Sequence, residues 1–153
     1  MKLNLGCGTD YREGFVNIDN RTDIKVDKNC DVSMLPFPDG CIEHILANDI
    51  LEHFSYREVE KVLKEWVRVL SPGGTIRIMV PNLKKIYSQY ADGTITPGRV
   101  VELLFGGQTY PGNFHHAGFD RTIVKNLFKK CGLEVIKIEE ALNNIAVIGK
   151  KYG

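Results

Sequence analysis

Residues 3–9, Leu-Asn-Leu-Gly-Cys-Gly-Thr, decide the fold of this 153-residue chain. Leu3 and Leu5 indicate a short buried strand, and Gly6 and Gly8 close it with a turn. Glycine allows a ligand to approach the backbone where a side chain would block it. In an open parallel sheet, ligands bind beyond the carboxyl ends of the strands, near the point where the strand order reverses. The stretch therefore predicts the first strand of an α/β sheet with a ligand site at its end.

Strand-like and helix-like segments alternate along the rest of the chain, which favours a sheet with helices on its faces. Further strands are expected at 15–18, weakly within 24–32, at 42–47, at 75–80, at 133–139 and at 144–150. The last two are joined by a tight connection and are therefore expected to be antiparallel.

Two helices are well marked. Residues 56–70 carry apolar side chains at helical spacing after a capping box of Ser55 and Glu58, and Ser71-Pro72-Gly73-Gly74 ends that helix. Residues 120–131 begin at a capping Asp120. The predicted inner face of this second helix consists of Ile123, Val124, Leu127 and Phe128. Less regular helices are expected at 83–90 and from Thr96-Pro97 onward.

Size and composition predict one globular domain spanning residues 1–153. Twenty basic residues against 19 acidic ones give a net charge of +1, without a dense basic stripe. A nucleic-acid partner held by phosphate neutralisation is therefore not expected. No apolar run approaches the roughly 20 residues that cross a bilayer, and no secretory signal precedes the first strand. Cys7, Cys30, Cys41 and Cys131 form no CxxC pair, so we expect a cytoplasmic protein without disulfides.

The first turn does not fit a dinucleotide-binding site. The GxGxxG fingerprint needs a glycine at position 11, where the chain has Tyr11. The second strand nevertheless ends in Asp19, and a carboxylate there can accept both hydroxyls of a ribose. The pattern favours a nucleoside ligand other than NAD.

Five motifs occur in a characteristic order: LNLGCG at 3–8, NID at 17–19, DVSMLPFPDG at 31–40, ANDILEHF at 47–54 and RVLSPGG at 68–74. Together they resemble the motif set of class I S-adenosylmethionine-dependent methyltransferases. The resemblance is strongest to a small bacterial group found with polysaccharide biosynthesis and glycosyltransferase genes. It covers about residues 2–82 and continues more loosely through 116–119 and the last strands. It implies a Rossmann-like three-layer sandwich around a mostly parallel seven-stranded sheet with an antiparallel last strand.

The resemblance also implies S-adenosylmethionine as cofactor, with S-adenosylhomocysteine as product. Residues of the first strand and turn would surround its methionine part: Asn4, Leu5, Gly6, Cys7, Gly8 and Thr9. Asn48 and Asp49, just past the fourth strand, would flank the amino acid end and the sulfonium.

The nucleoside part would be held by the next two strand ends. Asp19 would bind the ribose hydroxyls, with Asn20 beside the adenine. Asp31 would accept the adenine amino group, and the backbone N–H of Val32 would bind the ring. Asp27 replaces Asp31 in this role if the third strand has a different register.

Two features depart from the general family pattern. Only ten residues separate Gly8 from Asp19, so the usual helix between the first two strands must be very short or absent. The first strand begins at Lys2, so we also expect no N-terminal helix over the cofactor. A homodimer could supply the missing cover.

The acceptor side is less defined by the sequence. Residues 83–118 are expected to form a helical insertion that acts as a substrate lid. His115 and His116 fall in this region, and an imidazole suits removal of a proton from an accepting hydroxyl. No pair of His, Cys, Asp or Glu has convincing metal-ligand spacing, so no metal is assigned.

The predicted reaction is methyl transfer to a small-molecule acceptor, through an oxygen of a sugar or related metabolite, without a membrane partner. One alternative is methylation of an amino group in protein or nucleic acid. Such enzymes usually carry Asn/Asp-Pro-Pro-aromatic after the fourth strand, whereas this chain has Asn48-Asp49-Ile50-Leu51. A second alternative is a non-catalytic module that retains only the fold and the cofactor.

Overall fold

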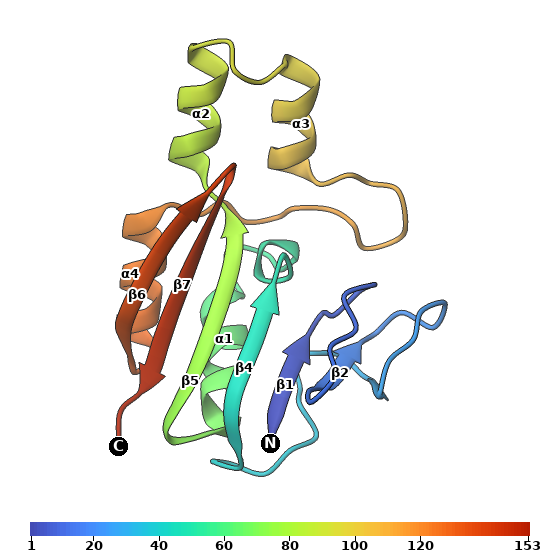
Figure 1. The fold of residues 1–153 in the computed structure, drawn as a ribbon, viewed down its shortest axis with the longest axis vertical. Helices are drawn as coiled ribbons and strands as arrows, with labels where there is room; N and C mark the ends of the chain where they lie inside the picture. The colour runs from blue at the N-terminus through green and yellow to red at the C-terminus, as the bar shows by residue number, and fades with distance from the viewer.

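The computed structural model describes all 153 residues, which form one seven-stranded sheet with helices against it (Figure 1). The strand order is β3-β2-β1-β4-β5-β7-β6, and only β7 runs against its neighbours. The strands are β1 (Lys2–Leu5), β2 (Val16–Asp19), β3 (Lys28–Asn29), β4 (Ile42–Asn48), β5 (Leu70–Pro81), β6 (Leu133–Ala141) and β7 (Asn144–Lys151). The helices are η1 (Leu51–His53), α1 (Val59–Val69), α2 (Leu83–Ala91), α3 (Pro97–Phe105) and α4 (Arg121–Lys130). The predicted mostly parallel sheet of the class I arrangement is confirmed.

The hydrophobic core lies between the sheet and helices α1 and α4, which pack on the same face (Figure 1). Trp66 of α1 and Phe128 of α4 are completely buried there. Along β5, Ile76 and Ile78 are buried in this core, whereas Arg77 points to the other face and is partly exposed. This alternation follows from the period of two in a strand.

The opposite face of the sheet carries no helix. Residues 6–15, 20–27 and 30–41, which connect the first four strands, form loops (Figure 1). No helix lies between Gly8 and Asp19, as their short spacing in the sequence predicted. The second helical layer of the predicted three-layer sandwich is therefore missing within residues 1–153, while the sheet itself has the expected order.

Over β1 and β2, this face of the sheet is covered by a network of hydrogen-bonded polar side chains and loop backbone. The buried Asn4 donates from Nδ2 to the Asp10 carbonyl at 2.8 Å and to Asn17 Oδ1 at 3.0 Å. Asn17 is also buried; its Oδ1 accepts from the Arg12 N–H at 2.9 Å and its Nδ2 donates to the Arg12 carbonyl at 3.0 Å. Because buried amides need partners, these bonds fix the loop that leads from β1 to β2.

Most predicted elements agree with the structure, but the capping box does not. Helix α1 begins at Val59 and not at Tyr56, and Glu58 makes no side-chain capping bond. The Ser55 hydroxyl accepts only from the Arg57 N–H at 3.3 Å, so residues 55–58 form a turn instead of the first helical turn. None of the helices is both long and apolar enough to cross a bilayer.

Helix α4 begins as predicted, with one correction to its inner face. Val124, Leu127 and Phe128 are buried, but Ile123 is 44% exposed because it lies one residue around the helix from that face. Asp120 Oδ1 accepts from the Ile123 N–H at 2.8 Å, which is the predicted cap.

We expect Asp120→Ala to lower the free energy of unfolding by about 1 kcal/mol, the usual cost of losing a side-chain cap. For a domain of this size that corresponds to a fall of about 2–4 °C in Tm. Asp120→Ser retains a capping oxygen and is the matched control. A thermal melt in which both variants fall equally would contradict the capping role.

Candidate active site

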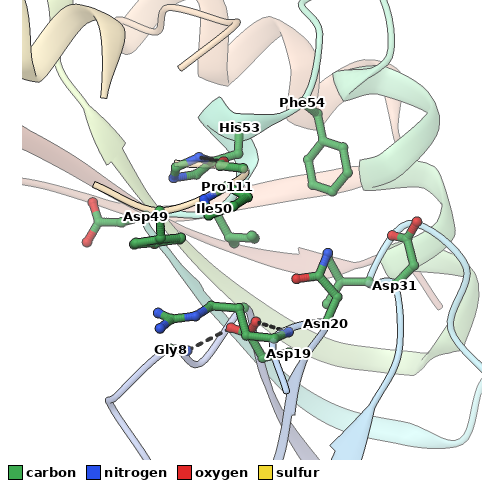
Figure 2. Close-up of a pocket in the computed structure, with 14 residues that line it drawn as sticks. Gly8, Asp19, Asn20, Asp31, Asp49, Ile50, His53, Phe54 and Pro111 are labelled. Atoms are coloured by element: carbon green, nitrogen blue, oxygen red, sulfur yellow. Dashed lines mark hydrogen bonds between the residues drawn. The ribbon is translucent and has the colours of Figure 1, made fainter. Parts of the chain in front are cut away.

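A pocket of about 280 Å³ lies at the carboxyl ends of β1, β2 and β4 (Figure 2). This is close to the lower end of the volumes typical of small-ligand sites. Predicted cofactor residues along its wall are Gly6, Gly8, Asp19, Asn20, Asp31, Val32 and Asp49. The remaining lining comes from Arg21, Ile50, His53, Phe54, Tyr110, Pro111 and Gly112. The structure thus brings together at one opening segments that are up to about a hundred residues apart.

The turn after β1 requires both of its glycines. Gly6 has a φ of +59°, and a Cβ placed on it would lie 2.5 Å from Ile50 Cγ1. Gly8 has a φ of +51°, a left-handed conformation that side chains disfavour. Between them, the Cys7 N–H donates to the Ile18 carbonyl at 3.0 Å, and the Cys7 side chain is buried. The turn therefore presents glycine backbone to the pocket.

Asp19, at the end of β2, joins this turn to the next loop. Its Oδ2 accepts from the Gly8 N–H at 2.8 Å and its Oδ1 accepts from the Arg21 N–H at 3.0 Å (Figure 2). A carboxylate oxygen has two lone pairs, so each oxygen keeps one acceptor position. Because Asp19 lines the pocket, these positions fit the two hydroxyls of a ribose.

The structure distinguishes Asp31 from Asp27. Asp31 lines the pocket, and its Oδ1 accepts from the Ser33 N–H at 2.8 Å. Asp27 does not line the pocket; its carboxylate accepts from the Asn17 N–H at 2.8 Å and from the Tyr11 hydroxyl at 2.7 Å. The geometry favours Asp31 as the residue that faces a bound base.

Five predicted cofactor residues do not line the pocket: Asn4, Leu5, Cys7, Thr9 and Asn48. Asn4 belongs to the polar network of the loop, and Leu5 to the core. Burial raises the pKa of the Cys7 thiol to about 11, so it is protonated at neutral pH. Asn48 Oδ1 accepts from the Arg77 guanidinium at 2.5 Å, on the open face of the sheet. Sequence spacing identified this strand end but not the direction of each side chain.

Asp49 lines the pocket from a strained position just beyond β4. Its φ is +50°, which is unusual for a residue with a side chain. Burial raises the pKa of its carboxyl, although Asn144 Nδ2 donates to its Oδ1 at 3.2 Å and opposes this effect. Strain of this kind is typical of functional positions.

Residues 110–112, in the loop that follows α3, also line the pocket. The Arg21 guanidinium lies 4.3 Å from the centre of the Tyr110 ring, a cation–π contact between two lining residues. His53 Nδ1 lies 3.1 Å from the Gly112 carbonyl oxygen. Figure 2 shows Pro111 beside His53. Sequence reasoning did not assign Arg21 or His53 to the site, because their contacts depend on where the 106–118 loop folds.

His115 and His116 line a second pocket, of about 200 Å³, which also contains residues of α3. His115 Nδ1 lies 3.0 Å from the Leu103 carbonyl oxygen, and burial lowers the pKa of its ring. The His116 ring stacks near Phe114, with centroids 6.3 Å apart. The ring of His53, which lines the first pocket, packs edge to face against the ring of His115, which lines the second, with ring centroids 4.9 Å apart.

Glu52 is the most unusual residue near the site and has no sequence signal of its own. Its side chain is buried, and neither carboxylate oxygen has a hydrogen-bond partner. Burial, and then the nearby Asp49 carboxylate, raise its pKa well above the ordinary value. Buried polar groups without partners are rare and call for an explanation.

We expect the ionised Asp27 carboxylate to stabilise the loops around the site, and this stabilisation to be lost in acid. The Asn17 N–H, and then the Tyr11 hydroxyl, lower its pKa below the ordinary 3.8. The stability that it contributes is therefore complete above about pH 4 and is lost as the pH falls through the lowered pKa. Asp27→Asn should show a shallower loss of stability in urea unfolding between pH 5 and 2, and Tyr11→Phe an intermediate one. Equal slopes in all three proteins would refute this assignment.

Comparisons with known proteins identify similar sequences and folds among methyltransferases. Residues 3–78 match the family model described as "Methyltransferase domain". Over 77 residues the chain is 38% identical to the mouse (Mus musculus) protein named "Probable tRNA methyltransferase 9B", an alignment that covers 50% of this chain and 17% of that protein. The chain thus spans about one sixth of the curated relative that it matches.

Solved structures share the whole fold at low identity. A SAM-dependent methyltransferase from Methanosarcina mazei has a TM-score of 0.71 and 17% identity, covering 99% of this chain and 92% of that one. The 1,6-didemethyltoxoflavin-N1-methyltransferase of Burkholderia thailandensis, solved with S-adenosylhomocysteine, has a TM-score of 0.65 and 14% identity, covering 99% and 71%. Residues 3–78 thus match a methyltransferase domain, and the whole chain shares the fold of SAM-dependent methyltransferases of known structure.

Proposed function

We propose that this chain transfers a methyl group from S-adenosylmethionine to an oxygen of a small polar acceptor such as a sugar. The observation that carries the cofactor part of this proposal is the Gly8–Asp19 bond at the adjoining ends of β1 and β2. It places a glycine backbone and a carboxylate with free lone pairs side by side in one pocket, where an α/β fold binds its ligand. The sugar acceptor follows from the resemblance of residues 2–82 to methyltransferases found with polysaccharide biosynthesis genes.

The lining residues define how the cofactor would be held. Gly6 and Gly8 would face the methionine part, Asp19 would accept from the ribose hydroxyls, and Asp31 would accept from the adenine amino group. Asn20 and Val32 complete the nucleoside side, and Asp49 completes the amino acid side. S-adenosylmethionine, when bound, supplies a methyl group that its sulfonium has already activated.

The segment 83–118 is proposed to hold the acceptor. Helices α2 and α3 stand beyond the carboxyl ends of the strands, and the loop that follows them returns over the cofactor pocket (Figure 1). Such a segment aligns the acceptor and excludes water, which is the main requirement when the methyl group is already activated. His115 and His116 lie on this side, so a proton-accepting role for either depends on the acceptor reaching the second pocket.

A second candidate acceptor is RNA, favoured by the relative whose name contains "tRNA methyltransferase". The balanced charge of the chain gives no independent support for an RNA surface. The expectation of no nucleic-acid partner rested on that balance, on the lack of a dense basic stripe and on the missing Asn/Asp-Pro-Pro-aromatic motif at 48–51. The relative is a direct reason to test it.

Isothermal titration calorimetry with S-adenosylmethionine, S-adenosylhomocysteine and NAD tests the cofactor assignment. We expect saturable binding of the first two and none of NAD. Purified chain is then incubated with labelled S-adenosylmethionine and either sugar nucleotides or total tRNA. Label in the sugar fraction supports the proposal, and label in tRNA supports the second candidate. Cofactor binding without transfer to any acceptor would favour a non-catalytic module, and absence of binding would refute the whole assignment.

A further inference from the structure

Glu52, His53 and His115 form a cluster that contains one lining residue of each pocket, His53 of the first and His115 of the second. Glu52 and His53 belong to η1, whereas His115 comes from the loop before α4. One potential ligand atom from each residue lies within 4.8 Å of the others. The backbone holds the two segments together, because the Glu52 carbonyl accepts from the His116 N–H at 2.8 Å and from the Ala117 N–H at 3.2 Å. The cluster is therefore fixed at the level of the main chain.

The Glu52 carboxylate has no hydrogen-bond partner in the protein. Its residue is only 1% exposed, and both oxygens lack a hydrogen-bond partner. A buried carboxylate is strongly unfavourable unless it is paired, hydrogen-bonded or bound to a metal. The neighbouring Asp49 adds a second acidic group to the same region. The missing partner is therefore a cation or a hydrogen-bond donor that enters from outside.

The two histidines present the atoms that a metal ion needs. His53 Nδ1 is 3.1 Å from the Gly112 carbonyl oxygen, and His115 Nδ1 is 3.0 Å from the Leu103 carbonyl oxygen. A carbonyl oxygen can only accept, so both Nδ1 atoms must carry the proton. In each neutral ring the lone pair is then on Nε2. Metal-binding histidines are commonly oriented in this way, with the other ring nitrogen donating to a backbone carbonyl.

We propose that Glu52, His53 and His115 bind one divalent transition-metal ion. Two imidazole nitrogens and one carboxylate oxygen favour ions such as Zn²⁺, Co²⁺ or Mn²⁺ over Ca²⁺, which prefers oxygen ligands. Small side-chain rotations would bring the donor atoms to the usual distances of about 2.0–2.2 Å from the ion. The spacing of these residues in the sequence gave no metal assignment, because His115 approaches η1 only in the folded chain.

The position of this ion gives it a role in binding the acceptor, an extension that rests on the proposed function. His53 lines the cofactor pocket and His115 lines the second pocket, so the ion would lie between them. Three protein ligands leave coordination positions open. An acceptor hydroxyl bound there would release its proton to water more readily, because a bound cation lowers the pKa of an oxygen ligand.

The test is a titration of the full chain, freed of metal by a chelator, with CoCl₂ and ZnCl₂ in the absence of cofactor. We expect one equivalent of Co²⁺ to give visible absorption bands, with displacement by Zn²⁺. We also expect Zn²⁺ at 100 times its Kd to raise Tm by about 5 °C or more. Absence of saturable binding would overturn the proposal. A thiolate-to-cobalt charge-transfer band would also overturn it, because it would assign the ion to a cysteine.

Variants locate the site. Glu52→Gln preserves shape and removes the charge, and His115→Ala removes one nitrogen ligand; each should weaken metal binding at least ten-fold. His44→Ala is the matched control, because His44 Nδ1 bonds to Thr75 Oγ1 on the open face of the sheet, and it should bind the metal as the wild type does. Circular dichroism verifies that each variant is folded. Unchanged affinity in both Glu52→Gln and His115→Ala would refute the assignment.

This outcome is independent of the cofactor proposal. The metal titration contains no S-adenosylmethionine, and the cofactor calorimetry is repeated with and without chelator. A chain that binds cofactor but no metal refutes only the metal site. A chain that binds metal but no cofactor confirms the metal site, refutes the proposed function and removes the acceptor role of the ion.

Discussion

Asp19→Ala is expected to weaken the binding of S-adenosylmethionine by about 100-fold or more, the largest effect of any single change in the pocket. Each hydrogen bond to a charged group contributes roughly 1.5–3 kcal/mol, and a ribose diol would lose two such bonds. The variant also loses the bonds from the Gly8 and Arg21 N–H groups, so the turn after β1 loses its brace. Calorimetry with S-adenosylmethionine and S-adenosylhomocysteine measures the change for both ligands.

Controls separate loss of binding from loss of fold. Asp39→Ala removes an exposed carboxylate that pairs with Arg68, away from the pocket, and should bind cofactor as the wild type does. Asp19→Asn keeps the size of the side chain but loses the charge, and should fall between Asp19→Ala and the wild type. Measurements well below the Tm of each variant ensure that the folded protein is compared. Wild-type affinity in Asp19→Ala would remove the basis of the ribose assignment.

The pocket residues at the ends of β1 and β2 could be predicted from the sequence because each follows directly from a short sequence pattern. Gly6 and Gly8 follow a buried strand directly, and Asp19 ends the next strand. In a parallel sheet the ends of neighbouring strands lie side by side, so two short patterns are enough to place these residues together. The absence of a helix between β1 and β2 followed from chain length alone. One face of the sheet is free of helices because the connections from β2 to β3 and from β3 to β4 are loops too, and the sequence did not predict this.

The choice between Asp27 and Asp31 could not be made from the sequence. Strand β3 has only two residues, Lys28–Asn29, and a strand of that length has no alternating pattern that fixes its register. The decision depends on Asn17 and Tyr11, which hold the Asp27 carboxylate away from the pocket. These are contacts between side chains of separate loops, and no spacing rule describes them.

Contacts on the acceptor side of the pocket were even less predictable from the sequence. Glu52 follows an apolar residue at the start of a helical segment, a position where a glutamate is ordinarily exposed. Its burial results from the return of residues 115–117 onto η1, through two backbone hydrogen bonds to its carbonyl. The sequence identified His115 as a residue of interest but could not pair it with Glu52 and His53, because this contact is made by tertiary structure alone.

Trp66→Ala is expected to cause the largest loss of stability, because Trp66 connects the core to the pocket. Its ring is completely buried between α1 and the sheet. Truncating a buried aromatic side chain costs about 3–5 kcal/mol, a large fraction of the roughly 5–15 kcal/mol that stabilises a domain. Urea unfolding followed by circular dichroism measures the change. Tyr56→Ala, at an exposed position just before α1, is the control and should change stability by about 0.5 kcal/mol or less.

Trp66→Phe tests whether the hydrogen bond from Trp66 to Val32 links the stability of the core to cofactor binding. Trp66 Nε1 donates to the Val32 carbonyl at 2.8 Å, and Val32 lines the proposed adenine side of the pocket. Phenylalanine keeps most of the apolar contact but leaves that buried carbonyl without its donor, which costs roughly 1–3 kcal/mol. Because the lost bond holds the 31–33 loop, cofactor affinity should fall together with stability, whereas a remote core change such as Phe128→Leu should lower stability alone. If Trp66→Phe lost stability but bound S-adenosylmethionine as tightly as the wild type, the loop would have to be held in place by other contacts.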